Sequence, residues 1–319
     1  MTRLRCAILD DYFNMTLQLA DWSKIKDRVD ITVFNEPFAS PEAAAGALKD
    51  FEIICAMRER TPFPPTLFAA LPKLKLLITS GMRNAAIDLE AAKEHRVVLC
   101  GTQWGRDPTA ALTMGLILEL TRHIGRENAR MHAGERLQKF IGLEIEGRTL
   151  GVVGLGKLGA RVSGLAKAFG MNVIAWSPNL TPERCKEVGV GYASKEKLFA
   201  TADIITVHMV LSQRSRGLVG QTDLARMKPT SYLVNTARGP IIDEAALLEA
   251  LQQRRIAGAA IDVFSIEPLP VDHPFRKLDN IVLTPHLGYV TEEGFRAHYG
   301  QMVEGIEAWL RGEPLRRLA

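Results

Sequence analysis

The sequence predicts an α/β protein built from two parallel sheets that are flanked by helices. Short apolar runs alternate with helical segments along the whole chain, as strand–helix–strand units require. A glycine-rich hexad, Gly154 to Gly159, connects one apolar run to a helical segment. The length of 319 residues suits roughly two domains, and an apolar fraction of 47% can fill a core in each.

The first third of the chain carries its own set of strands. Its apolar runs are separated by helical stretches and lie at residues 5–9, 30–34, 53–57, 74–79 and 97–100. This order predicts a separate α/β unit. A long helix is expected next, from Thr109 to Arg130, with apolar residues on more than one face. Such a helix is buried on several sides, either between domains or at a dimer interface.

The rest of the chain predicts a second, larger sheet. Around the hexad, a strand over residues 149–153, a helix over 160–169 and a strand over 172–176 form a strand–helix–strand unit. Further elements are four strands and a final helix, expected at residues 204–207, 232–234, 258–263, 281–283 and 291–310. With helices between its strands, this part forms a doubly wound parallel sheet.

The hexad, Gly154-Leu155-Gly156-Lys157-Leu158-Gly159, has the spacing of a dinucleotide-binding turn. The first glycine permits the tight turn, the second lets the backbone approach a pyrophosphate, and the third lets the helix pack closely on the strand. The helix N-terminus then faces the anion. Glycine-rich turns also occur without a nucleotide, but the strand–helix–strand context favours the nucleotide here.

Composition excludes several classes of function. The net charge of +4 is spread along the chain without a basic block, so nucleic-acid binding is not expected, and attraction of an anionic substrate is the alternative. The cysteines are isolated, lack metal-ligand spacing and predict reduced thiols; they are Cys6, Cys55, Cys100 and Cys185. No signal-peptide pattern and no apolar run of roughly 20 residues is present. We therefore expect a cytoplasmic protein without a metal site or membrane association.

Three polar side chains are candidates for catalysis, because each follows one of the last three strands of the second sheet. They are Arg238, Glu267 and His286. In an open parallel sheet, functional groups gather at the carboxyl ends of the strands, so these three are expected at one edge.

These residue types suit the reduction of a 2-oxo acid. Arg238 offers a bidentate donor for the substrate carboxylate and carbonyl groups. His286 can donate the proton that the forming alkoxide needs, and a carboxylate beside it, Glu267, favours the protonated imidazole. Each residue taken singly has a structural alternative, because an arginine after a strand often forms a salt bridge and a loop histidine often binds a carbonyl group.

The hexad is one of four motifs that occur in a fixed order. The others are Asn235-Thr236-Ala237-Arg238-Gly239, Asp262-Val263-Phe264-Ser265-Ile266-Glu267-Pro268 and Thr284-Pro285-His286-Leu287-Gly288. The set resembles the D-2-hydroxy-acid dehydrogenases, including glyoxylate and hydroxypyruvate reductases and short phosphoglycerate dehydrogenases. The resemblance implies a Rossmann-type cofactor domain, residues 102–289, inserted into a smaller flavodoxin-like substrate domain of residues 1–101 and 290–319. It also implies a homodimer formed through the cofactor domain.

The resemblance further implies roles for individual residues. Arg238 anchors the 2-oxo acid, His286 is the acid/base, and Glu267 orients and charges it. The expected contacts of an NAD(P) cofactor are Thr109, Gly154, Gly156, Lys157, Leu158, Gly159, Ser177, Pro178, Met209, Val210, Thr236, Ala237, Arg238, Asp262, His286 and Gly288. The expected substrate contacts are Arg58, Gly81, Met82, Arg83, Arg238 and His286.

Two segments depart from the family pattern. In the loop over residues 79–84, whose backbone N–H groups are expected to hold a carboxylate, Arg83 stands where an acidic residue is common. We expect Arg83 or Arg58 to bind a second polar or anionic group of the substrate; the alternative is a solvated loop arginine.

The second departure concerns the cofactor. An acidic residue normally follows the strand over 172–176 and binds the ribose 2′-hydroxyl of NAD. Ser177, Pro178 and Asn179 stand there instead. The missing repulsion of a 2′-phosphate favours NADP(H), or use of both cofactors, over NAD(H) alone. Arg184 is either a phosphate ligand or a solvated helix residue.

Two positions and one other function complete the expectations. His208 is expected to be a packed, hydrogen-bonded loop histidine, and Tyr289 either narrows the pocket or packs against the final helix. The alternative function is nucleotide sensing with partner binding, because the C-terminal-binding protein corepressors also resemble this family. Replacing His286 separates the two, since a reductase loses turnover and a sensor keeps its partner.

Overall fold

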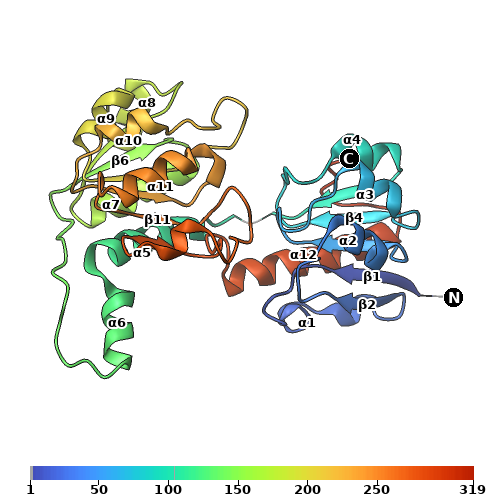
Figure 1. Cartoon of the computed structure of the whole chain (residues 1–319). Coiled ribbons are helices and arrows are strands. Elements are labelled where there is room, and N and C mark those ends of the chain that lie inside the picture. Colours follow the sequence, from blue (N-terminus) through green and yellow to red (C-terminus); the bar gives the residue numbers. More distant parts are fainter. Residues whose placement is uncertain (1–2, 104) are drawn as a thin grey trace. The chain divides into compact units, whose positions relative to one another are not determined.

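The computed structural model describes residues 3–103 and 105–319 and divides the chain into two compact units (Figure 1). Unit 1 comprises Met1–Arg106 and Thr291–Ala319, and unit 2 comprises Asp107–Val290. The sequence predicts the domain boundaries after residues 101 and 289. These lie five residues and one residue before the boundaries in the structure. Each unit contains one parallel sheet flanked by helices, so the predicted α/β fold class is confirmed.

Unit 1 has a five-stranded sheet in the order β2-β1-β3-β4-β5, and every strand pair in it is parallel. Its strands are β1 (Leu4–Ile8), β2 (Val29–Val33), β3 (Ile53–Ala56), β4 (Leu76–Thr79) and β5 (Val98–Gly101). From β1 the chain passes to β2 on one side, and it then adds β3, β4 and β5 in turn on the other side. The carboxyl ends of β1 and β3 therefore form the switch point of this sheet, where ligands bind in open α/β folds.

Helices cover the sheet of unit 1. They are α1 (Thr16–Leu19), α2 (Pro41–Leu48), α3 (Pro65–Ala70), α4 (Leu89–Glu94), α12 (Glu292–Leu310) and the 3₁₀ helix η1 (Trp22–Ile25). The helices α2, α3 and α4 share one apolar cluster with the strands. The helix α12 packs on α1 and β4, and at Gly305 it approaches so closely that a Cβ atom would lie 3.1 Å from Cδ1 of Ile78.

Unit 2 has a seven-stranded sheet in the order β12-β11-β10-β9-β6-β7-β8, again with parallel pairs throughout. Its strands are β6 (Thr149–Val153), β7 (Asn172–Trp176), β8 (Gly191–Tyr192), β9 (Ile204–Val207), β10 (Tyr232–Asn235), β11 (Gly258–Ile261) and β12 (Ile281–Leu283). The order reverses between β6 and β9, which is the switch point of this doubly wound sheet.

Helices cover both faces of this second sheet. They are α5 (Pro108–Arg122), α6 (Ile124–His132), α7 (Lys157–Ala168), α8 (Pro182–Val188), α9 (Lys195–Thr201), α10 (Gln221–Arg226), α11 (Glu244–Gln252) and the 3₁₀ helices η2 (Gly239–Ile241) and η3 (Pro274–Lys277). One apolar cluster joins the strands to α5, α7 and α8, and another joins them to α9, α10 and α11.

The predicted continuous helix from Thr109 to Arg130 is wrong. The helix breaks at His123, which adopts a left-handed backbone with φ of 54°. The Glu119 carboxylate accepts the Gly125 N–H at 2.8 Å and so satisfies the start of α6. The helix α6 has no buried residue, whereas α5 is buried along most of its length.

Among the described residues, no helix combines the length and apolar character needed to cross a membrane.

Candidate active site

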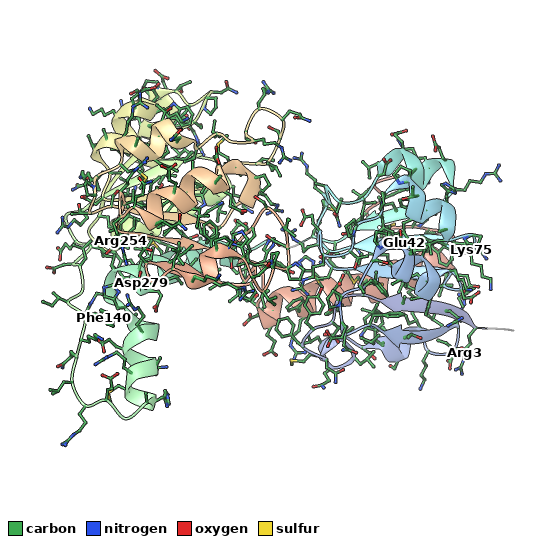
Figure 2. All side chains as sticks on the ribbon, viewed as in Figure 1. Arg3, Glu42, Lys75, Phe140, Arg254 and Asp279 are labelled. Atoms are coloured by element: carbon green, nitrogen blue, oxygen red, sulfur yellow. The ribbon has the colours of Figure 1, made fainter. Side chains whose placement is uncertain are left out.

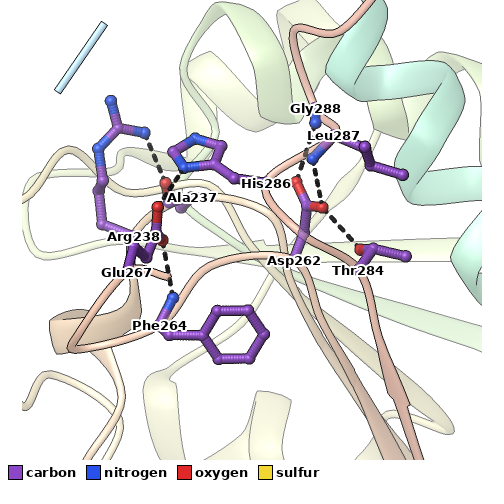
Figure 3. Close-up of polar contacts among 9 residues, drawn as sticks. All are labelled: Ala237, Arg238, Asp262, Phe264, Glu267, Thr284, His286, Leu287 and Gly288. Carbon is purple, nitrogen blue, oxygen red and sulfur yellow. Dashed lines mark hydrogen bonds and ion pairs between the residues drawn. The ribbon is translucent and has the colours of Figure 1, made fainter. Parts of the chain in front are cut away.

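The three polar residues expected at one sheet edge are brought together in unit 2. Arg238, Glu267 and His286 follow β10, β11 and β12, which are neighbours in the sheet, and their side chains gather at its carboxyl edge (Figure 3). Nδ1 of His286 lies 2.7 Å from Oε2 of Glu267. A carboxylate in this position fixes the ring orientation and leaves Nε2 as the nitrogen that can exchange a proton with a bound molecule.

Glu267 is held as an anion. Its other oxygen, Oε1, accepts the Phe264 N–H at 2.9 Å. Burial acts to raise the pKa of Glu267, but the hydrogen bond and charge of His286, the Phe264 N–H and the nearby Arg238 guanidinium outweigh it. The pKa therefore lies below its usual value, and Glu267 is charged at neutral pH.

The main chain positions His286 as firmly as Glu267 does. His286 has a left-handed backbone with φ of 55°, which is uncommon for a residue with a side chain. Its N–H is shared between the carbonyl oxygens of Asp262 at 2.8 Å and Thr284 at 3.0 Å. The Tyr289 ring meets the imidazole edge to face with a centroid distance of 5.4 Å, so Tyr289 contacts the histidine itself.

Asp262 clamps the loop that carries the histidine. Its Oδ1 accepts the Thr284 hydroxyl at 2.6 Å and the Leu287 N–H at 2.7 Å, and its Oδ2 accepts the Gly288 N–H at 2.9 Å (Figure 3). Burial raises the pKa of Asp262, and these donors and the His286 charge oppose that rise. The sequence places Asp262 among the cofactor contacts and misses this clamp, because its partners lie more than twenty residues away.

Arg238 sits at the start of η2. Its Nη1 donates to the Ala237 carbonyl at 2.7 Å, while the Asn235 side chain accepts the Ala237 N–H and donates to the Arg238 carbonyl. These local bonds hold the turn that presents the guanidinium. Because Arg238 lowers the pKa of Glu267 through its charge, the arginine adds positive potential to the edge where a carboxylate is expected to bind.

The glycine hexad has the geometry that a dinucleotide needs. Gly154 has φ of +102°, and a Cβ atom there would lie 2.9 Å from the His208 carbonyl carbon. A Cβ atom on Gly159 would lie 2.0 Å from the Gly154 carbonyl oxygen, whereas Gly156 faces open space. Gly156 is also the N-cap of α7, and no side chain caps that end. The residues present therefore fit a pyrophosphate at the N-terminus of α7.

The helix α7 begins at Lys157, inside the hexad and three residues before the position that the sequence predicts. Lys157 forms an ion pair with Asp107 at 3.2 Å, and Leu158 is partly buried against the core. Gly159 lies within the first turn of the helix, where it permits the close approach to Gly154.

The remaining expected cofactor contacts fall into two groups. Thr109 donates to the Gly288 carbonyl at 2.8 Å, and the hydroxyl groups of Thr236 and Thr113 lie 3.0 Å apart, so these residues form one polar group at the start of α5. Ser177 and Pro178 lie in a turn directly after β7, and Arg184 forms an exposed ion pair with Glu187 at 2.9 Å. Met209 is partly buried, whereas Val210 is 76% exposed.

The expectation for His208 is wrong in one respect. Its side-chain nitrogens are buried, but neither has a hydrogen-bond partner among the described residues. Burial lowers its pKa to about 4.

Unit 1 holds the expected substrate loop. Arg58, directly beyond β3, has a left-handed backbone with φ of 52°; its N–H donates to Oγ of Ser80 at 2.8 Å, and its carbonyl accepts the Asn84 side chain. Gly81 has φ of +90°, and a Cβ atom there would lie 2.8 Å from Nη1 of Arg58. The arginine therefore lies over the loop, and only glycine fits beneath it.

One part of the expected anion cradle is already occupied. The Gly81 N–H donates to the Thr102 hydroxyl at 2.9 Å, and that hydroxyl lies 2.6 Å from Nδ1 of the buried His298. The N–H groups of Met82 and Arg83 have no hydrogen-bond partner within the described part of the chain. The Asn84 N–H likewise has no partner there, so three N–H groups of the loop remain for an anion.

Sequence reasoning missed a further group at the switch point of unit 1. The Arg60 guanidinium lies 4.4 Å from the Tyr12 ring and donates to the Asp10 carbonyl at 2.8 Å. The buried Asp10 carboxylate accepts the Thr61 and Tyr12 hydroxyl groups. The signal that points to it is the strand order, because Asp10 and Arg60 follow β1 and β3.

Three comparisons relate the chain to known proteins. A family model described as "D-isomer specific 2-hydroxyacid dehydrogenase, NAD binding domain" matches residues 114–288, which include the hexad, Arg238, Glu267 and His286. The D-3-phosphoglycerate dehydrogenase of Bacillus subtilis is 38% identical over 261 residues, which cover 81% of this chain and 50% of that protein. This chain therefore spans about half the length of that relative.

Two other proteins match over most of their length. The glyoxylate reductase of Korarchaeum cryptofilum is 32% identical over 299 residues, which cover 91% of this chain and 90% of that protein. The crystal structure of phosphoglycerate oxidoreductase from Vibrio cholerae superposes with a TM-score of 0.92 at 33% identity, covering 97% of this chain and 99% of that chain.

Proposed function

This chain belongs to the D-isomer-specific 2-hydroxyacid dehydrogenase family, and from that premise we propose that it is an NAD(P)-dependent oxidoreductase interconverting a 2-oxo acid and a D-2-hydroxy acid. The observation that carries the proposal is the His286–Glu267 pair at 2.7 Å beside Arg238, on the carboxyl edge of the sheet that also bears the glycine hexad. An acid/base pair, an anion-binding cation and a dinucleotide turn are the three parts that this reaction needs.

In the proposed reduction, the bound nicotinamide supplies the hydride. Arg238 binds the substrate carboxylate through its guanidinium fork and thereby orients the neighbouring carbonyl group. His286 donates a proton from Nε2 to the oxygen atom that becomes the hydroxyl group, and the Glu267 carboxylate stabilises the charged ring before this transfer. In the oxidation, His286 takes the proton back. The Asp262 carboxylate, which clamps the loop, keeps the imidazole in place for both directions.

Residues of the same unit are proposed to hold the cofactor. The uncapped N-terminus of α7 binds the pyrophosphate, with Gly154 and Gly156 allowing its approach. The polar group of Thr109, Thr236 and Gly288 lies on the side of β10 and β12 and is the candidate site for the nicotinamide half. Ser177 and Pro178, after β7, are the candidates for the adenosine ribose.

Use of NADP(H), or of both cofactors, follows from the end of β7. No acidic residue stands at positions 176–179, so a ribose 2′-phosphate meets no carboxylate there. Ser177 and Asn179 can donate to a hydroxyl or to a phosphate group. Arg184 forms an exposed ion pair with Glu187, and the proposal rests on Ser177 and Asn179. Comparing kcat/KM for NADH and NADPH tests the point; a preference for NADH above about a hundredfold contradicts it.

For the substrate, we propose a 2-oxo acid such as glyoxylate, hydroxypyruvate or a bulkier homologue, with a polar or anionic group read by Arg58 or Arg83. Support comes from the left-handed backbone of Arg58 and from the N–H groups of Met82 and Arg83.

The panel of 2-oxo acids to assay is glyoxylate, hydroxypyruvate, pyruvate, phenylpyruvate and oxaloacetate. The Arg83→Gln variant is expected to raise KM for substrates with a second anionic or polar group, whereas Lys49→Gln, an exposed cation in the same unit, leaves KM unchanged. Unchanged KM values on the whole panel for both Arg83→Gln and Arg58→Gln would overturn this assignment.

We also propose that the chain acts as a homodimer through unit 2. The helix α6 and the loop after it extend away from the sheet (Figure 1), and this arm, residues 124–142, exposes large apolar side chains. Met131 is 65%, Leu137 is 77% and Ile141 is 97% exposed. Phe140, labelled in Figure 2, is partly buried and contacts Arg126 at 4.0 Å and the His123 ring at 5.2 Å. Exposed apolar segments of this extent mark protein–protein contact sites.

A cavity of about 440 Å³ accompanies the arm. It lies at the amino ends of β10, β11 and β12, on the edge of the sheet opposite to His286, and Glu119, Arg126, Tyr232 and Asp279 line it. A second copy of the arm is its proposed occupant.

The four cysteines are buried and form no disulfide, which supports action in a reducing compartment such as the cytoplasm.

A further inference from the structure

His208 is a partly buried residue with buried ring nitrogens, and the proposed reaction does not use it. Both of its ring nitrogens lack a hydrogen-bond partner within the described residues. A neutral imidazole carries one donor and one acceptor, and leaving both unpaired inside a protein is unfavourable. Buried groups without partners are uncommon in native proteins, so the position calls for a physical reason.

The position of His208 supplies that reason. His208 follows β9, and its N–H donates to the Val153 carbonyl at the end of β6 at 2.8 Å. These two strands form the switch point of the sheet. A Cβ atom on Gly154 would lie 2.9 Å from the His208 carbonyl carbon. His208 therefore borders the first glycine of the dinucleotide turn.

The alternation of side chains along β9, continued one position beyond its end, places His208 on the face of the sheet that carries the anion-binding helix. Ile205 and Val207 belong to the apolar cluster of α9, α10 and α11, whereas Ile204 belongs to the cluster of α5 and α7. Side chains alternate between the two faces along a strand. Thr206 and His208 consequently share the face of α5 and α7, and α7 is the helix with the uncapped N-terminus.

We propose that the His208 imidazole is a cofactor-binding group, one of whose unpartnered nitrogens pairs with a ribose hydroxyl of the bound dinucleotide. A hydroxyl can both donate and accept, so it can pair with either nitrogen of a neutral ring, whereas a phosphate can pair only with the nitrogen that carries the proton. Both nitrogens are covered in the cofactor-free chain, so binding must turn the ring or shift residues 208–211. Val210 in that segment is 76% exposed. This inference rests on the dinucleotide binding of the proposed function and assigns His208 a part in it.

The native protein offers a direct test by NMR spectroscopy. The ring ¹⁵N and N–H signals of His208 are recorded at pH 7.5 with and without saturating NADH or NADPH, and the His208→Gln variant assigns them. Pairing on cofactor binding is expected to move the N–H proton downfield and to slow its exchange with water at least tenfold. Signals that stay unchanged while the cofactor saturates the protein would overturn the proposal.

Variants provide a second, independent readout in the dissociation constants for NADH and NADPH, measured by nicotinamide fluorescence. His208→Leu removes donor and acceptor, and we expect cofactor binding about tenfold weaker with no fall in the melting temperature of the cofactor-free chain. His208→Gln keeps one donor and one acceptor and is expected to bind within about threefold of the unaltered protein.

Thr206→Val is the matched control. Thr206 lies two residues earlier on the same strand and the same face, and its buried hydroxyl also lacks a partner among the described residues. Its removal is expected to raise the melting temperature by about 2 °C and to leave cofactor affinity unchanged. The contrast separates loss of a cofactor contact from relief of an unpaired buried group.

Two results contradict the proposal in different ways. If His208→Leu binds both cofactors as tightly as the unaltered protein, His208 has no contact with the dinucleotide. If it lowers the melting temperature and weakens binding only in proportion, and His208→Gln does the same, the residue is structural. If the unaltered protein binds neither NADH nor NADPH, the proposed function itself fails and this inference fails with it.

Discussion

His286 is held in place by the main chain as much as by Glu267. The loop has little freedom for three reasons. The backbone of His286 is left-handed, its N–H donates to two carbonyl groups, and the Asp262 carboxylate holds the residues that follow. A proton donor must stay within hydrogen-bond reach of one oxygen atom, so this restraint suits the proposed chemistry. The charged Glu267 then tunes a ring that is already in position.

Glu267→Gln tests whether the main chain positions His286 while the Glu267 charge favours its protonated form. The amide keeps the shape of the side chain but removes its charge, so the protonated imidazole is no longer favoured. We expect kcat for reduction to fall by roughly 10²-fold, and the loss of rate with rising pH to begin at a lower pH than in the unaltered protein. The pH profile of kcat/KM measures both effects. Asp272→Asn, an exposed acidic residue in the same loop, should leave the profile unchanged; a profile unaltered by Glu267→Gln would contradict the assigned role.

Stability should depend on pH through two buried histidines. Burial lowers the pKa of His208 and of His298 to about 4, from an ordinary value of 6.5. Between these values the unfolded chain binds protons that the folded chain does not, so acidification favours unfolding. The free energy of unfolding is expected to be constant above pH 6.5 and to fall by about 1.4 kcal/mol per pH unit for each histidine towards pH 4.

Urea unfolding of the cofactor-free protein at several pH values between 7.5 and 4.5 measures this slope. His208→Gln removes one of the two groups and is expected to make the slope shallower. A free energy of unfolding that stays constant between pH 6.5 and 5 would show that the histidines are not buried as neutral groups.

Sequence reasoning reaches some of these residues and not others. Arg238, Glu267 and His286 can be found because each follows a strand, and parallel strands deliver such residues to one edge. The clamp of Asp262, the unpaired ring of His208 and the Arg60–Tyr12 contact depend on side chains that are far apart in the sequence. Their partners are set by tertiary packing, which no local pattern encodes.

The first turn of α7 shows how tightly a helix can be fitted to a strand. Gly159 packs on the Gly154 carbonyl, whereas Gly164, later in the same helix, has open space around it. Gly159→Ala is expected to lower the free energy of unfolding by about 1–3 kcal/mol, because the methyl group forces α7 away from β6. Gly164→Ala should raise it by about 0.5–1 kcal/mol through the better helix propensity of alanine.

Chemical denaturation of the two variants measures the contrast. Equal effects at the two positions would contradict the close contact at Gly159. The Gly159→Ala variant is also expected to weaken dinucleotide binding, since the shift of α7 moves the N-terminus that faces the pyrophosphate.

The helices are the elements whose limits the sequence predicts least well. Strands β6, β7, β9 and β12 lie where the apolar runs predict them, because burial and strand propensity agree there. The break at His123 is not predicted, because the left-handed position is occupied by a histidine and not by the usual glycine. It depends on the Glu119 carboxylate, which accepts the Gly125 N–H and lets α6 begin in a new direction.

The arm formed by α6 and the following loop makes a prediction about assembly. If a second copy covers Ile141, then Ile141→Asp is expected to weaken dimerisation by at least tenfold, because a charge would be buried against apolar surface. Val271→Asp is the matched control, since Val271 is 92% exposed on another loop of unit 2. Analytical ultracentrifugation across a concentration series distinguishes the two. A monomeric unaltered protein, or equal dissociation constants, would contradict the dimer through this arm.

At the level of the whole chain, the order of strands and motifs predicts both sheets, and the family model and solved structures agree with that architecture. The substrate is not predictable in the same way. We propose that it depends on Arg58 and Arg83 in unit 1. The left-handed backbone of Arg58 and the hydrogen bond from its N–H to Ser80 are set by tertiary packing rather than by a motif.

The oxidation of NADH and NADPH by 2-oxo acids, followed by absorbance for the unaltered protein and for His286→Asn, tests the acid/base assignment most directly. We expect turnover of at least one 2-oxo acid by the unaltered protein and a loss of about 10²–10⁴-fold in kcat for His286→Asn, with cofactor affinity retained. Turnover by the variant at the unaltered rate would contradict the role of the His286–Glu267 pair. Cofactor binding without turnover of any 2-oxo acid by the unaltered protein would favour a nucleotide sensor instead.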